Sequence, residues 1–286
     1  MELLKKTAVE LHEALKNKEI SAVELTKASI ERIEKLDNTL GTFNSLTIEK
    51  ALETAKKVDE KIAKKEQIPY LAGIPTALKD NMNYKGSKTT CSSKILENFT
   101  SPYNATITEK LEENLIPILG KTNLDEFAMG SSNENSAFRI VKNPYNLNKV
   151  PGGSSGGSAA SVSASLVTLS LGSDTGGSIR LPASFCGIVG FKPTYGRVSR
   201  YGLVAFASSL DQIGPFSKSI EDTTRLYEAI AGYDPKDSTS LNLEVGDISG
   251  NLKKDIKGLK VGVIKELMAE GTSDDVKSAV ENAIKT

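Results

Sequence analysis

Residues 151–160 read Pro-Gly-Gly-Ser-Ser-Gly-Gly-Ser-Ala-Ala, and an Ala/Ser helix pattern and the apolar run LVTLSLG (166–172) follow at once. A flexible glycine-serine linker is one interpretation of such a block. Linkers, however, are not usually followed directly by a helix pattern and a buried strand pattern. We therefore disfavour the linker interpretation.

Helix and strand patterns alternate on either side of this block. Helix patterns cover 48–65, 105–114 and 219–231, and a buried strand pattern covers LIPILGKTN at 115–123. Such alternation is typical of βαβ units and predicts an α/β fold. Near the end, 258–264 (GLKVGVI) reads as a strand and 273–286 as a helix without a C-cap glycine or proline. We expect the fold to be truncated there.

The first 68 residues have a helical pattern. Ser21 begins the capping box Ser21-Ala22-Val23-Glu24, and an apolar stripe follows it. The segment YLAGIPTALKDNM then changes character, with Gly73 and Pro75 as helix breakers. We expect a helical region over 1–68 that packs on an incomplete catalytic core over 69–286, the two forming one domain.

Composition excludes several classes of protein. The 286 residues carry 36 basic and 36 acidic side chains, whereas proteins that grip nucleic acid usually have a basic excess. Two cysteines, Cys91 and Cys186, are too few for a disulfide framework or a cysteine metal site, and we expect no metal. The N-terminus lacks the apolar segment of a signal peptide, and no run is long enough to span a membrane. We expect a cytoplasmic protein.

Histidine is nearly absent. His12 is the single histidine, and its amphipathic helix pattern predicts a solvated or half-packed side chain. Residues 152–156 match the Gly-x-Ser-x-Gly nucleophile elbow, but that motif needs a histidine later in the chain. The phosphate-loop pattern GxxxxGK[ST] is also missing from the glycine-rich block. A serine enzyme with this sequence therefore needs a base other than histidine.

A lysine is the alternative base. A serine hydroxyl needs a group that removes its proton, and a lysine can do so when burial lowers its pKa. Lys79 follows the apolar residues Ile74, Ala77 and Leu78, unlike the many lysines in charged helices. It is our candidate for a buried, functional lysine.

A second block, 172–180, reads Gly-Ser-Asp-Thr-Gly-Gly-Ser-Ile-Arg. Paired glycines allow backbone N–H groups to approach a developing oxyanion. A tight turn between a strand and a helix would explain the same residues. The block on its own leaves both interpretations open.

The two blocks, together with Lys79, resemble the amidase signature family. The resemblance implies a mixed β-sheet flanked by helices on both sides, and a Ser-Ser-Lys triad. Ser178 would be the nucleophile, Lys79 the general base and acid, and Ser154 the serine after a cis peptide bond that relays the proton. The resemblance further implies an oxyanion hole at Thr175, Gly176 and Gly177, and substrate contacts at Met129, Gly130 and Ser131.

Three more segments, 121–138, 209–216 and 232–240, are similar to family members that serve tRNA-dependent amidation. They imply a glutaminase that supplies ammonia for converting Glu-tRNA(Gln) to Gln-tRNA(Gln), within a heterotrimer that also contains the B and C subunits of the amidotransferase. This chain would bind no cofactor, and ATP, magnesium and most of the tRNA contacts would belong to the B subunit. Such members are longer, and they commonly have glutamine where this chain has Leu181. A free-standing amidase and an inactive, partner-binding scaffold remain the alternatives.

Overall fold

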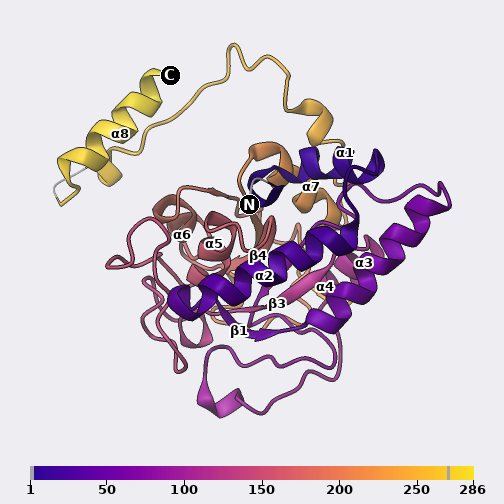
Figure 1. Ribbon diagram of the computed structural model, residues 1–286. Coiled ribbons are helices and arrows are strands. Elements are labelled where there is room, and N and C mark those ends of the chain that lie inside the picture. The colour runs from indigo at the N-terminus through magenta and orange to yellow at the C-terminus, as the bar shows by residue number, and fades with distance from the viewer. Residues whose placement is uncertain (1–2, 269–270) are drawn as a thin grey trace. The chain divides into compact units, whose positions relative to one another are not determined.

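The computed structural model describes residues 3–268 and 271–286 (Figure 1). The chain forms two compact units, the first ending at Gly250 and the second covering Asn251–Thr286. The division at 68/69 expected from the sequence lies within the first unit. This unit contains the whole sheet and both glycine-rich blocks.

The sheet of the first unit has six strands. In spatial order they are β1 (Phe43–Leu46), β3 (Ile118–Thr122), β2 (Thr76–Lys79), β4 (Leu169–Asp174), β6 (Gln212–Ser217) and β5 (Val189–Gly190). Strand β2 is parallel to β3 and β4, and the other neighbouring strands are antiparallel. The predicted mixed sheet is confirmed.

Both faces of the sheet are covered because its central strands are apolar on both sides. Leu78 and Ile118 belong to one hydrophobic core, and the preceding Ala77 and following Leu119 belong to the other. Successive side chains of a strand point to opposite faces, so the two cores lie on opposite sides of the sheet. The first core includes residues of α1 (Ala8–Lys16), α4 (Thr106–Glu113) and α7 (Ile220–Ile230), and the second includes residues of α5 (Gly156–Ser163). The predicted flanking helices are therefore confirmed (Figure 1).

The described residues contain eight α-helices. They are α1 (Ala8–Lys16), α2 (Ala22–Leu40), α3 (Ile48–Ala63), α4 (Thr106–Glu113), α5 (Gly156–Ser163), α6 (Arg180–Phe185), α7 (Ile220–Ile230) and α8 (Asp274–Lys285). Short 3-10 turns cover Leu3–Lys5, Lys94–Leu96, Glu126–Ala128, Ser249–Asn251 and Lys265–Met268. The capping box predicted at Ser21 forms and starts α2, which Gly41 ends in the left-handed conformation at φ 72°.

Three local features differ from the sequence-based expectations. The N-terminal region is not wholly helical, because β1 lies within it and pairs with β3. Residues 258–264 are exposed and form no strand, since no described strand pairs with them. His12 is only 8% exposed, because its ring stacks on Tyr70 with centroids 4.3 Å apart. In the part of the chain that the structure describes, no helix has the length and apolar character to cross a membrane.

Candidate active site

Lys79 is the last residue of β2, in the middle of the sheet, and its side chain is fully buried. Its Nζ lies 2.7 Å from Ser154 Oγ and 2.9 Å from Ser173 Oγ. Burial lowers the pKa of Lys79 to about 7, although Asp125 and Asp174 act in the opposite direction. Burial therefore favours the neutral amine that a lysine base requires.

Ser154 lies in the turn before α5, and the Gly153–Ser154 peptide bond is cis. The turn is held on both sides of this bond. Gly153 N–H donates to Ser131 O at 2.7 Å, and Ser154 O accepts from Asp125 N–H at 3.2 Å. A Cβ at Gly153 would lie 2.0 Å from a carboxylate oxygen of Asp125, so only glycine fits this position.

Ser178 lies between β4 and α6, and its side chain is half-buried. Its carbonyl oxygen accepts a hydrogen bond from Ser155 N–H at 3.2 Å. The structure thus brings the two glycine-rich blocks together, and Lys79 contacts both of them, through Ser154 and Ser173. This geometry places the three predicted triad residues in one region of the molecule.

Asp174, the last residue of β4, shapes the turn that carries Ser178. Its carboxylate accepts hydrogen bonds from Gly177 N–H at 2.7 Å and Ile179 N–H at 3.0 Å, and pairs with Arg180 Nη2 at 3.1 Å. Burial acts to raise the pKa of Asp174, but Arg180 and these N–H groups together hold it below its ordinary value. The carboxylate is therefore ionised and anchors the turn. The sequence patterns did not single out this residue.

The expected oxyanion hole lies in this turn. Gly177 N–H is engaged by Asp174, whereas the N–H groups of Gly176 and Ser178 have no acceptor within residues 3–268 and 271–286. A Cβ added at Gly176 or Gly177 would meet nothing within 4 Å, so this side of the turn is open. Thr175 Oγ1 donates to Asp211 Oδ1 at 2.5 Å. The turn that carries Ser178 thus has two backbone donors without an acceptor and an open side at its glycines.

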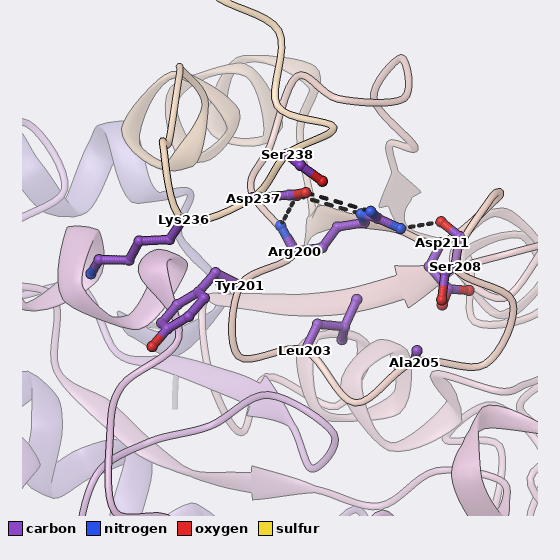
Figure 2. A pocket seen from close by; sticks show the side chains of 9 residues that line it. All are labelled: Arg200, Tyr201, Leu203, Ala205, Ser208, Asp211, Lys236, Asp237 and Ser238. Atoms are coloured by element: carbon purple, nitrogen blue, oxygen red, sulfur yellow. Dashed lines mark hydrogen bonds and ion pairs between the residues drawn. The ribbon is translucent and has the colours of Figure 1, made fainter.

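Asp211 is one of the residues that line a pocket of about 250 Å³ (Figure 2). Its lining residues come from the loops around 200–211 and 236–238: Arg200, Tyr201, Leu203, Ala205, Ser208, Asp211, Lys236, Asp237 and Ser238. Figure 2 shows the Arg200 side chain directed at Asp237, whose carboxylate also accepts Arg200 N–H at 2.8 Å. Arg200 therefore links the two loops that line the pocket. Asp211, a third lining residue, is hydrogen-bonded to Thr175 in the turn that carries Ser178.

The predicted substrate residues Met129, Gly130 and Ser131 lie on a loop that wraps around Asp125. Met129 is 54% exposed and Ser131 is exposed, while a Cβ at Gly130 would lie 2.4 Å from Asp125 Cγ. Asp125 fixes the loop by accepting Asn133 N–H at 3.0 Å. Because Ser131 O contacts Gly153 N–H, the loop lies beside the turn that carries Ser154. Nothing in the sequence around Asp125 distinguishes it from a solvated acid.

The fold and the site define a class of protein. A sequence profile of the family described as Amidase matches residues 24–286, and the chain belongs to this family. Its fold also matches solved amidase structures. Native peptide amidase from Stenotrophomonas maltophilia is 33% identical with a TM-score of 0.79, over 85% of this chain and 51% of that chain.

More similar relatives carry one particular name. The A subunit of glutamyl-tRNA(Gln) amidotransferase from Trichormus variabilis is 60% identical over 278 residues, which are 96% of this chain and 57% of that protein. The crystal structure of the Thermotoga maritima protein of the same name is 47% identical with a TM-score of 0.73, covering 85% of this chain and 50% of that chain. The chain thus spans somewhat more than half the length of the relatives it matches.

Proposed function

We propose that Ser178 is the nucleophile of a Ser-Ser-Lys triad with Lys79 as the base. The observation that carries this proposal is the 2.7 Å contact between Lys79 Nζ and Ser154 Oγ in a fully buried site. Neutral Lys79 would accept the Ser154 hydroxyl proton while Ser154 Oγ takes the proton of Ser178. Ser178 Oγ would then bond to the amide carbon of the substrate.

The remaining groups of the site would stabilise and position the reacting amide. The oxyanion hole expected at Thr175, Gly176 and Gly177 would use donors other than the Gly177 N–H, which Asp174 engages. The free N–H groups of Gly176 and Ser178 would receive the developing oxyanion, and the open space beside Gly176 supports this role. Protonated Lys79 would return its proton through Ser154 to the leaving nitrogen, so that ammonia departs and an acyl-enzyme forms. Water would then hydrolyse the acyl-enzyme. Met129, Gly130 and Ser131 would contact the substrate.

We propose glutamine as the substrate of this site. We infer that the chain is the glutaminase part of a glutamyl-tRNA(Gln) amidotransferase, because relatives of that name are 55–60% identical to it. Its ammonia would convert Glu-tRNA(Gln) to Gln-tRNA(Gln) on the B subunit, which would hold ATP and magnesium, in a cytoplasmic heterotrimer completed by the C subunit. The equal numbers of basic and acidic residues agree with a partner that carries the tRNA.

A free-standing amidase is the second candidate. The match to a peptide amidase supports it, since that enzyme has the same fold. Such an enzyme would cleave simple amides without any partner. The scaffold alternative is disfavoured because Lys79 and Ser154 keep the contact that a base needs.

Ammonia release from glutamine tests the proposal. We expect release that rises when the B and C subunits are added and that Ser178→Ala abolishes. Turnover of simple amides but not of glutamine would favour the free-standing amidase. A serine-directed fluorophosphonate provides a second readout, because it should label the wild-type chain at Ser178 even where glutamine is not bound. A folded chain that resists the probe would contradict the triad.

A further inference from the structure

A second lysine is fully buried beside the proposed catalytic lysine, and the proposed reaction does not use it. Lys121 lies in β3, next to β2, and its side chain is 0% exposed. In the sheet register Lys121 is opposite Leu78 and Thr122 is opposite Lys79. Because neighbouring residues of a strand point to opposite faces, Lys121 and Lys79 project from opposite faces of the sheet.

The two lysines have different partners. Lys121 Nζ donates to Asp80 Oδ1 at 3.1 Å, Lys88 O at 3.0 Å and Thr89 Oγ1 at 3.1 Å. An ammonium group has three protons, so this set satisfies a charged lysine completely. In contrast, Lys79 contacts serine oxygens, and no described carboxylate is within ion-pair distance of it.

Asp80 connects the two lysines, since it directly follows Lys79 in the chain and is buried with 0% exposure. Its second oxygen accepts Asn44 Nδ2 at 3.0 Å and the Thr90 hydroxyl. Among the described residues, the side chains of Asp80 and Lys79 therefore share no hydrogen-bond partner. The desolvation cost of a buried ion pair offsets most of its attraction. Stability alone therefore does not explain the Lys121–Asp80 pair.

We propose that Lys121 is a positioning residue that neutralises Asp80 and holds it away from Lys79, leaving the amine of Lys79 to the serines. This inference rests on the proposed function of Lys79 as the base. If Lys121 were absent, an uncompensated buried carboxylate would lie one residue from that base and would favour its charged form. If Asp80 were absent, the cation of Lys121 would have the opposite effect.

The other charged groups around Lys79 are the same in every variant of the test. Those that act on its charge are Asp125, Asp174 and Asp211, with the thiol of Cys91. Burial raises the pKa of Cys91 to about 12, so the thiol stays neutral near pH 7. Asp80 and Lys121 also act on the Cys91 thiol, in opposite directions. A change in the pH profile therefore reports on the Asp80–Lys121 pair, acting directly or through this thiol.

The test measures the rate of Ser178 labelling by a fluorophosphonate against pH in the full chain. For Lys121→Met we expect the rising limb of the profile to move up by about one pH unit, and for Asp80→Asn to move down by a similar amount. A purely structural role would lower the rates without moving the limb. Lys218→Met is the matched control, because Lys218 is also a partly buried lysine but contacts Leu4 O and Ser165 Oγ instead. It should keep the wild-type profile.

The double variant Asp80→Asn/Lys121→Met keeps the test decisive where a single variant fails to fold, since it leaves no unpaired buried charge. We expect its limb to return to within a few tenths of a pH unit of the wild-type position. A folded double variant with a displaced limb, or single variants with the wild-type limb, would overturn the role of Lys121. A wild-type chain that does not label at all would overturn the proposed function itself.

Discussion

Lys79 and Lys121 are both fully buried, and they differ in the atoms that their amines contact. Lys121 faces a carboxylate and two further oxygens, an arrangement that suits an ammonium ion. Lys79 faces hydroxyl groups and a carbonyl oxygen, and burial alone lowers its pKa to about 7. Burial lowers the pKa of Lys121 as well, but its ion pair with Asp80 opposes that shift. The same residue type thus forms an ion pair at one position and is a candidate base at the other.

The pH dependence of Ser178 reactivity follows from Lys79. Because burial lowers its pKa to about 7, the neutral base is scarce below that pH and predominant above it. The rate of fluorophosphonate labelling should therefore rise through pH 7 and level off above it. Lys79→Met should lower the plateau by roughly 10²–10⁴-fold, the usual contribution of a general base. A variant that labels at the wild-type rate would exclude Lys79 as the base.

The turn between β4 and α6 is organised by hydrogen bonds to a single carboxylate, that of Asp174. Asp174 ends β4, and its two oxygens collect N–H groups from Gly177, Ile179 and Arg180. Gly177 adopts φ 128°, a conformation that side-chain-bearing residues rarely accept. Gly176 has no such φ, and a Cβ there would meet only open space. Glycine is therefore required at position 177 for its backbone conformation, and at position 176 it leaves space beside the turn.

Replacing each glycine by alanine distinguishes the two roles. Gly177→Ala should lower the free energy of unfolding by roughly 1–3 kcal/mol, because alanine is strained at this φ. Gly176→Ala should change it by less than about 0.5 kcal/mol, yet its methyl group would fill the space where we expect the substrate. Urea denaturation of both variants gives the comparison, and labelling of Ser178 reports on the site. Equal losses of stability in the two variants would contradict a conformational role that is specific to Gly177.

Local patterns predicted the elements whose partners lie near in sequence. The 48–65 helix pattern corresponds to α3, and the apolar run 166–172 leads into β4. The apolar residues before Lys79 predicted its burial correctly. The strand predicted at 258–264 was wrong, because apolar alternation cannot supply the neighbour that a strand must pair with. Asp125 and Asp174 were missed for a related reason: their partners are backbone N–H groups whose positions exist only in the folded loop.

The hydrophobic cores belong to the first compact unit. Every buried residue of both cores lies between Leu4 and Ala231. Beyond them, Asp234 still ties the loop after α7 to the rest of this unit, since it accepts hydrogen bonds from Ser199 Oγ at 2.6 Å and from the Thr106 hydroxyl at 2.5 Å. In the second unit, none of the described residues is buried. The stability of the first unit should therefore depend on the chain up to Gly250.

Shortened chains test this dependence. A chain that ends at Gly250 should retain the urea midpoint and the Ser178 labelling rate of the full chain, because it keeps both cores, the triad and the Asp234 contacts. A chain that ends at Ala231 is the matched control. Loss of Asp234 leaves the buried hydroxyls of Ser199 and Thr106 without their acceptor, which should cost about 1–3 kcal/mol for each group. A lower midpoint already in the chain ending at Gly250 would show that residues 251–286 stabilise the catalytic unit.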